Sequence, residues 1–337
     1  MKVAITGSIA TDHLLTFPGR FAEQLLPEHL AHLSLSFLVD GLEVRQGGVA
    51  ANIAFGLGAL GHRALLVGAV GPDFADYGRR LTARGVDLAA VRVSTTQHTA
   101  RFTCTTDQEG NQLASFYPGA MAEASGIDLT TVLREHAPGL VLIGADDPEA
   151  MLLHTRACRS LGIRFAADPS QQLARLDGAM CRELVSGADH LFTNEYEDAL
   201  LLRKTGWTRG EVLGRVGTWV TTLGERGCRI EAADRPATEV AAVPVVTVVD
   251  PTGAGDAFRA GYLAGLSCGL DAGRSARAGS TMAALALEAA GTQTYEVVPE
   301  RVDSLLRTTY GAVAPRLRDF GWTEGARPPS VAGSTHG

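Results

Sequence analysis

Short apolar runs alternate with stretches of helical spacing along most of the chain. The runs that predict buried strands are residues 3–6, 140–144, 165–168, 190–193 and 219–223. Helical spacing is evident at 148–161, where Asp147 is the expected N-cap, and at 198–206. This alternation predicts an α/β fold, with a doubly wound, mostly parallel sheet, right-handed crossovers and helices on both faces.

Two segments interrupt the alternation. In the first, proline and glycine break the pattern before partial alternation at 34–40 predicts a strand. In the second, residues 99–107 and 112–116 predict a β-hairpin. We expect these segments, about 13–46 and 92–118, to pair into a small antiparallel sheet that acts as a lid.

A glycine-rich turn at Thr252–Gly255 separates two further elements. The β-branched run 245–249 predicts a strand buried on both faces, and helical spacing follows Asp256. Peptide N–H groups of such a turn can converge on an anion at a helix N-terminus. A carboxylate there fits a general base that deprotonates an attacking hydroxyl while the amides neutralise a phosphoryl group. The alternative is a structural junction, with Asp256 as a partner of the helix dipole.

Three other polar groups have both a functional and a structural interpretation. Asp12, in the loop expected after the first strand, can bind a substrate hydroxyl or cap its own loop. Asn52 lies one turn into a small-residue helix and offers a donor and an acceptor to a diol, whereas tight helix packing would explain only its small neighbours. Asn194 and Glu197 have the spacing of one helical turn, which suits a Mg²⁺ shell, a triphosphate or a capping box.

One glycine motif is excluded by its context. Gly56, Gly58 and Gly61 match the dinucleotide fingerprint, with Asp76 at the required distance. However, helical residues precede the motif and the strand follows it, which reverses the required order. We therefore expect no NAD site.

Composition narrows the functional classes. The net charge of −7 argues against a nucleic-acid surface, and no apolar run is long enough for a membrane span. Five cysteines without a C-x-x-C pair fit reduced thiols, and the first residues enter a strand without a signal-peptide pattern. We expect a cytoplasmic protein with a folded domain over 1–322 and a disordered tail at 323–337.

Four motifs together resemble the ribokinase-like (PfkB-type) carbohydrate and nucleoside kinases over about the first 320 residues. They are Gly47-Gly48-x-x-x-Asn52, Asn194-x-x-Glu197, Thr222-x-Gly224-x-x-Gly227 and Asp250-Pro-Thr-Gly-Ala-Gly-Asp256. Within this family, stretches such as 7–13, 21–30, 34–40, 100–107 and 168–175 are most similar to bacterial adenosine kinases of the actinobacterial type.

The resemblance implies specific roles. Asp256 would deprotonate the ribose 5′-hydroxyl, and the amides of Gly253, Ala254 and Gly255 would form the anion hole. The substrate pocket would comprise Ser8, Asp12, Ser36, Gly48, Asn52, Phe102, Phe116, Gln171 and Gln172. The ATP contacts would be Asn194, Thr222, Leu223, Gly224, Glu225, Arg226, Gly227 and Gly255.

Two metal ions are also implied by the resemblance. Glu197 would orient Mg²⁺ through water. Asp250 and Thr252, with the segment around Gly291, would hold K⁺, although Pro251 replaces the threonine common at that position.

The expected activity is ATP-dependent phosphorylation of adenosine to AMP. The alternatives are a sugar kinase of the same fold acting on ribose or fructose, and a non-catalytic nucleoside- or sugar-binding protein. Because Leu35, Phe37 and Val39 would form an apolar face on the small sheet, we also expect a homodimer through the lid.

Overall fold

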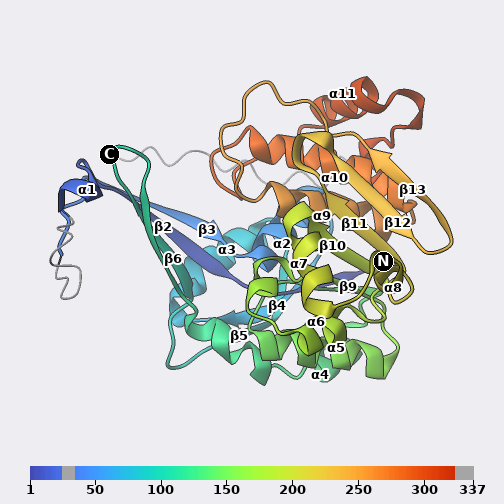
Figure 1. Cartoon of the computed structure of the whole chain (residues 1–337), viewed down its shortest axis with the longest axis horizontal. Helices are drawn as coiled ribbons and strands as arrows, with labels where there is room; N and C mark the ends of the chain where they lie inside the picture. The colour runs from blue at the N-terminus through green and yellow to red at the C-terminus, as the bar shows by residue number, and fades with distance from the viewer. Residues whose placement is uncertain (25–34, 323–337) are drawn as a thin grey trace.

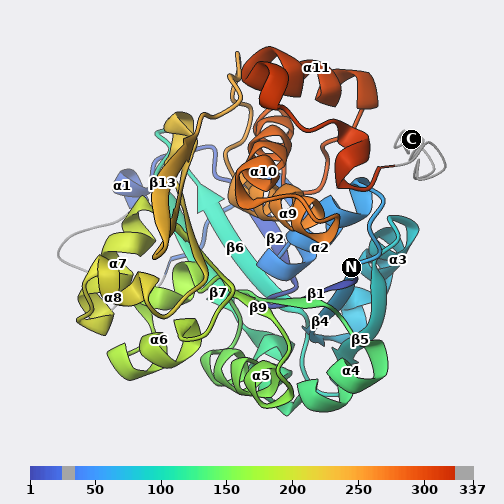
Figure 2. The ribbon, with the colours of Figure 1, turned by 90° about the vertical axis from the view of Figure 1, so that its right-hand side faces the viewer.

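The computed structural model describes residues 1–24 and 35–322. A nine-stranded sheet forms its centre, flanked by helices on both faces (Figures 1 and 2). Its strands, in spatial order, are β13 (Arg235–Val240), β12 (Cys228–Ala232), β11 (Thr218–Thr222), β10 (His190–Asn194), β9 (Phe165–Ala167), β8 (Leu140–Ile143), β1 (Val3–Thr6), β4 (Leu65–Val70) and β5 (Asp87–Val93). All pairings from β11 to β5 are parallel, and the β12–β13 hairpin adds two antiparallel strands at one edge. The predicted doubly wound α/β architecture is confirmed.

Successive residues of each strand point to opposite faces of the sheet and contribute to two separate hydrophobic cores. Ile5 and Leu66 belong to one core, whereas their neighbours Ala4 and Leu65 belong to the other. The first core is covered by α2 (Val49–Ala59), α3 (Ala75–Ala83), α9 (Ala254–Ser267), α10 (Ala272–Leu287) and α11 (Pro299–Tyr310). The second is covered by α4 (Leu129–His136), α5 (Pro148–Leu161), α6 (Gly178–Val185), α7 (Glu195–Thr205) and α8 (Arg209–Leu213). Because strands buried on both faces need apolar residues throughout, they appear in the sequence as continuous apolar runs.

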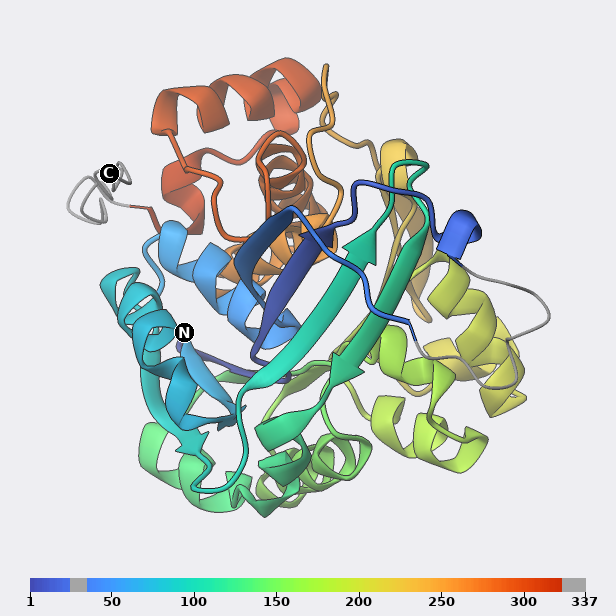
Figure 3. The same cartoon turned by 90° about the vertical axis from the view of Figure 1, so that its left-hand side faces the viewer.

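A second, four-stranded sheet projects from the body, with α1 (Phe21–Gln24) near its far end (Figures 1 and 3). Its order is β3 (Gly41–Gly47), β2 (Ala10–Thr16), β6 (Ala100–Thr106) and β7 (Gln112–Tyr117). The two outer pairings are antiparallel, and the predicted hairpin is β6–β7. The central pairing of β2 with β6 is parallel, so the small sheet is antiparallel at its two outer pairings and not throughout, as predicted.

Two predicted strands are wrong. Residues 35–40 are not in a strand, and the strand that pairs with β2 begins only at Gly41, opposite Thr16. Phe37 instead packs against Phe17 and Phe21, with ring centroids 5.0 Å and 5.1 Å away, so the expected apolar face of Leu35, Phe37 and Val39 does not form. A strand partner, which the sequence pattern does not show, sets where the strand begins.

The second error is the valine-rich run 245–249, which is neither a strand nor buried. Val246 is 99% exposed, and the run connects β13 to α9 at the protein surface. The run pairs with none of the described strands, and β13 is left as the edge of the sheet. β-Branched composition alone therefore overpredicted burial.

Asp12 lies on strand β2 rather than in the predicted loop, since that loop is only Gly7–Ile9. The rejected dinucleotide motif lies largely inside helix α2, in agreement with its exclusion. The tail 323–337 falls outside the described residues, as does Ser34 of the predicted strand. No helix in the described ranges is long and apolar enough to cross a membrane.

Candidate active site

A cleft of about 590 Å³ lies at the carboxyl ends of the parallel strands. Asn194 ends β10, Thr222 ends β11, and the first turn of α9 closes the cleft with Gly253, Gly255 and Asp256. Doubly wound sheets place their ligands at this edge. Three of the four sequence motifs therefore contribute residues to one cavity.

The glycine turn leaves the start of α9 open. Gly253 is the N-cap residue with φ of 78°, and an added Cβ would lie 2.8 Å from the Thr292 side chain, so only glycine fits. No side chain caps the helix, and the N–H groups of Gly255 and Asp256 find no acceptor among the described residues. These donors are available to an anion in the cleft.

Asp256 lies in the first turn of α9 and faces the cleft. Its Oδ2 accepts a hydrogen bond of 2.8 Å from Asn52 Nδ2, which orients the carboxylate. Desolvation by the surrounding protein raises the pKa of Asp256 to about 7, although Asn52 and Arg259 oppose that rise. A carboxylate whose pKa lies near neutral pH is suited to general-base catalysis.

Arg259 is a buried cation one helical turn beyond Asp256. Its guanidinium forms a bidentate pair with Asp168, with N···O distances of 2.7 and 2.8 Å. A third contact, 3.2 Å from Nη1 to the carbonyl oxygen of Gly255, holds it beside the glycine turn. Both partners are almost inaccessible to solvent. Arg259 is a site residue that the sequence motifs do not predict, although a single charge within the otherwise apolar stretch Phe258 to Leu263 is a signal for a buried ion pair.

Asn52 is held by a buried network that the sequence did not reveal. Its Oδ1 accepts hydrogen bonds from Thr292 Oγ1 and Gln293 Nε2, each 2.8 Å long. Gln293 also donates to the hydroxyl of Tyr77, which in turn donates to the Gly47 carbonyl. With Oδ1 occupied and Nδ2 bound to Asp256, Asn52 positions the carboxylate in this structure, and one amide hydrogen remains for a substrate hydroxyl.

Asp12, Phe102 and Phe116 lie in one row across the small sheet. Asp12 is in register with Phe102, and Phe102 with Phe116, so the three side chains share a face. Arg45 of β3 extends the row and contacts Asp250 of the body, which shows that this face is turned toward the body. Burial raises the pKa of Asp12, and the charge of Arg45 opposes that rise.

Ser8 and Gly48 shape the junction between β1 and α2. Ser8 Oγ accepts a 3.0 Å hydrogen bond from the Val49 N–H at the start of the helix. Gly48 has φ of 95°, and a Cβ there would lie 2.6 Å from the Ser8 carbonyl oxygen, so the chain requires glycine. Ser36, by contrast, is exposed, in the segment between α1 and β3, and does not line the cleft.

The two glutamines assigned to the base side are in different environments. Gln171 is exposed at the cleft, next to Ser170, whose hydroxyl bonds to its Oε1. Gln172 is buried, and its Nε2 donates to the backbone carbonyl of Asp146. Asp146 is itself buried, and desolvation raises its pKa to about 8. Gln172 therefore lies behind the cleft wall, away from the lining residues.

Asn194 and Glu197 form the capping box of α7, as their structural interpretation proposed. Glu197 Oε2 accepts the Asn194 N–H, and Asn194 Oδ1 accepts the Glu197 N–H, each at 2.8 Å. Both residues also line the cleft, so the capping role does not remove them from the site. Burial raises the pKa of Glu197, and the charge of Arg259 opposes that rise.

The residues around Glu197 fit a magnesium ion held mainly by other ligands. No cluster of three or more acidic, histidine or cysteine side chains suited to a metal occurs within the described ranges. Glu197 offers one carboxylate at the cleft, and Mg²⁺ in phosphoryl-transfer sites typically keeps several waters and phosphate oxygens as ligands. Glu197 would then act through water, and the ion would neutralise phosphate charge.

Only part of the predicted Thr222–Gly227 ATP segment reaches the cleft. Thr222, in register with Asn194, lines it, as does Gly224, where a Cβ would meet open space. Leu223, Glu225, Arg226 and Gly227 do not line the cleft. Arg226 pairs with Glu195, and Gly227 packs against the backbone of Val240. The segment thus supplies two cleft residues and a tight turn that orients them.

The surroundings of Asp250 do not fit a potassium ion. Its Oδ1 accepts the Thr252 N–H at 2.9 Å, and its Oδ2 accepts the Gly291 N–H at 3.1 Å and Arg45 Nη1 at 2.7 Å. Oδ2 thus accepts two donors, and the guanidinium of Arg45, which also pairs with Glu43, already lies in direct contact with it. A second cation there would be repelled by Arg45.

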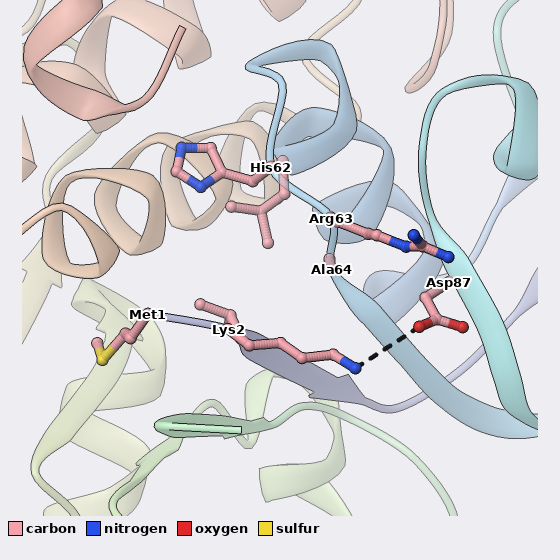
Figure 4. A pocket seen from close by; sticks show the side chains of 8 residues that line it. Met1, Lys2, His62, Arg63, Ala64 and Asp87 are labelled. Atoms are coloured by element: carbon pink, nitrogen blue, oxygen red, sulfur yellow. Dashed lines mark ion pairs between the residues drawn. The ribbon is translucent and has the colours of Figure 1, made fainter. Parts of the chain in front are cut away.

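A different cavity, of about 400 Å³, lies at the amino ends of the strands, on the side of the sheet opposite the cleft (Figure 4). It is lined by residues that precede β1 and β4, among them Lys2 and Arg63, and by Asp87 at the start of β5, which pairs with Lys2. Its lining includes neither the glycine turn nor the capping pair, which both belong to the carboxyl-end cleft.

The chain is similar to several kinases of known structure or sequence. One similar structure is that of a nucleoside kinase from Burkholderia thailandensis in complex with inosine. The two proteins are 36% identical in sequence and superpose with a TM-score of 0.81, and the alignment covers 93% of this chain and 99% of the Burkholderia chain. A nucleoside kinase from Methanocaldococcus jannaschii is 27% identical over 308 residues, which span 90% of this chain and 97% of the relative. Arabidopsis thaliana ribokinase, solved with ribose and ATP, has a TM-score of 0.73 at 20% identity, covers 91% of this chain and 98% of its own, and shares the fold.

The family model of the pfkB carbohydrate kinases matches residues 20–299, a span that contains the glycine turn, the carboxylate it presents and the capping pair. Members of this family are phosphotransferases that use ATP with Mg²⁺ and a hydroxyl acceptor. Because the match covers most of the chain and includes the residues that build the cleft, the protein belongs to the pfkB family of carbohydrate kinases.

Proposed function

We propose that the protein is an adenosine kinase, which transfers the γ-phosphoryl group of ATP to the ribose 5′-hydroxyl of adenosine and yields AMP, as in purine salvage. The observation that carries this proposal is the row formed by Asp12, Phe102 and Phe116. It places a carboxylate suited to a diol beside two aromatic rings suited to a base, on the face turned toward the body. The inosine bound by the Burkholderia relative also supports a purine nucleoside.

The proposed mechanism uses groups already in place at the cleft. Asp256 accepts the proton of the 5′-hydroxyl while that oxygen forms its bond to the γ-phosphorus, and the bond from phosphorus to the oxygen of the leaving ADP breaks. The free N–H groups at the start of α9 stabilise the charge on the transferred phosphoryl group. The proton remains on Asp256, whose pKa of about 7 allows its return to solvent. The small sheet, acting as a lid, would exclude water as a competing acceptor.

The direct test measures ADP release with Mg-ATP and one acceptor at a time: adenosine, inosine, ribose or fructose. We expect turnover with adenosine at a higher kcat/KM than with either free sugar. A preference for inosine would still support a nucleoside kinase, but one that prefers a base other than adenine. A preference for ribose or fructose would instead support the sugar-kinase alternative, and nucleoside binding without turnover of any acceptor would support the binding-protein alternative.

Replacing Phe116 by alanine distinguishes nucleoside from sugar recognition. Phe116 is 47% exposed, and its ring is available for stacking on a base. We expect KM for adenosine to rise by about tenfold or more, since a base–aromatic contact contributes on the order of 1–3 kcal/mol, while KM for ribose stays unchanged. The control is Tyr117→Ala, because Tyr117 is the next residue of β7 and points to the other face. An unchanged KM for adenosine in Phe116→Ala would remove Phe116 from the base site.

We further propose a homodimer through the outer face of the small sheet, in the cytoplasm. Leu42, Val44 and Leu113 are exposed on the face opposite Asp12, in adjoining rows of β3 and β7. Light scattering should give twice the 35.4 kDa chain mass, and Val44→Glu should reduce it to a monomer. A wild-type monomer would contradict this proposal.

The cytoplasmic location is supported by all five cysteines being free thiols.

A further inference from the structure

Arg45 connects the small sheet to the turn that carries the candidate base. It belongs to β3, where it is in register with Asp12 of β2. Its Nη1 donates to Asp250 Oδ2 across 205 residues of sequence, at 2.7 Å. Asp250 opens the segment Asp250–Asp256, in which the N–H groups of Gly255 and Asp256 have no acceptor among the described residues and face the cleft at the start of α9. One guanidinium therefore lies between the substrate-facing row of the sheet and the anion-binding turn.

The position of Arg45 is fixed from two sides. Its Nε and Nη2 donate to the two carboxylate oxygens of Glu43, at 2.7 and 2.8 Å, so the guanidinium plane is held by its own strand. Gly291, with φ of 87°, lies against its stem, and a Cβ there would approach Arg45 Cδ to 3.2 Å. Absence of a side chain at Gly291 leaves the room through which Arg45 reaches Asp250.

Asp250 also holds two backbone segments in place through hydrogen bonds. It accepts the N–H of Thr252 just before Gly253, and the N–H of Gly291, next to the Thr292 that bonds Asn52. A cation beside this carboxylate would therefore stabilise the turn and the segment that orients Asn52. The guanidinium of Arg45 already supplies a positive charge in contact with this carboxylate, and it would repel a metal ion placed there.

We propose that Arg45 is a positioning residue that takes the place of a monovalent cation beside Asp250 and couples the small sheet to the anion-binding turn. The kinetic part of this inference rests on the proposed function, whereas the coupling itself does not. When the small sheet closes over an acceptor, Arg45 is held beside Asp250 and its charge stabilises the turn. A bound acceptor therefore favours the arrangement of the turn that phosphoryl transfer needs.

The kinetic test compares potassium chloride with tetramethylammonium chloride at equal ionic strength. For the wild type we expect kcat/KM to differ between the salts by less than about twofold, because Arg45 already places a positive charge in contact with Asp250. Arg45→Met should lower kcat/KM by about tenfold, the scale of a lost hydrogen bond between charged groups, and potassium should restore part of it. Arg45→Lys should retain more activity than Arg45→Met. Arg80→Met is the control, since Arg80 is exposed on α3 and its guanidinium makes one long hydrogen bond within the described residues, to Gln46 at 3.5 Å.

A second readout does not need the reaction. Hydrogen exchange of the β3 amides should become faster in both Arg45→Met and Asp250→Asn, and no faster still in the double variant, because both changes break one contact. Faster exchange in an enzyme inactive on nucleosides would support the coupling and refute only the proposed substrate. Potassium stimulation of the wild type by about tenfold, or β3 exchange that neither substitution changes, would overturn the inference.

Discussion

Replacing Asp256 by asparagine should lower kcat by at least about a hundredfold, the usual scale for loss of a general base. The amide keeps the shape of the side chain but does not accept the proton of the acceptor hydroxyl. The free N–H groups of Gly255 and Asp256 remain, so binding of the acceptor and of ATP should change little. Steady-state kinetics with adenosine, together with calorimetric binding of adenosine, checks both parts.

The pH dependence gives this prediction a direction. Only ionised Asp256 accepts a proton, so wild-type kcat/KM should rise with pH and level off above about 7. Because burial raises the pKa, the folded protein binds this proton more tightly than the unfolded chain, and its contribution to stability falls as pH rises from about 4 to about 7. The amide in Asp256→Asn cannot ionise, so the melting temperature of this variant at pH 8 should equal or exceed that of the wild type.

The control for this substitution is Asp271→Asn. Asp271 caps α10 through a hydrogen bond from the Arg274 N–H and lies outside the cleft, and asparagine can cap equally well. We expect its kinetics to match the wild type. Near-normal turnover in Asp256→Asn would show that another group takes the proton.

Replacing Arg259 by methionine should affect both stability and the pH profile. Asp168 would be left buried without its partner, which typically costs about 3–5 kcal/mol of unfolding free energy. Loss of the cation should also raise the pKa of Asp256 further, since Arg259 now opposes the effect of burial. The midpoint of the kcat/KM profile should move to higher pH, with activity partly recovered at alkaline pH. Chemical denaturation and pH-dependent kinetics measure the two effects.

A double variant separates the two effects. Arg259→Met with Asp168→Asn removes both charges of the pair, so stability should recover in part. The pH midpoint should stay above that of the wild type, because Arg259 influences Asp256 more strongly than Asp168 does. Arg156→Met, at an exposed pair with Glu183, should change neither quantity. A wild-type pH midpoint in Arg259→Met would mean that Arg259 acts only in folding.

Local patterns predicted the features that depend on a few consecutive residues. The turn Gly253–Gly255 was recognised because convergent N–H groups need only small residues before a helix, and the strands and helices followed from their hydrophobic period. The same local signals failed at 34–40 and 245–249. Whether an apolar run becomes a strand depends on a partner strand, and the run 245–249 pairs with none of the described strands.

The sequence by itself therefore determined the α/β architecture, the glycine turn before α9 and the candidate base, because each follows from neighbouring residues. The tertiary structure alone decided which side chains from distant parts of the chain surround that base. Arg259 meets Asp168 across 91 residues, and Asn52 meets Asp256 across 204. Such contacts form because the alignment of strands and the packing of helices bring distant side chains within hydrogen-bond reach. No pattern of neighbouring residues predicts which distant side chains will meet.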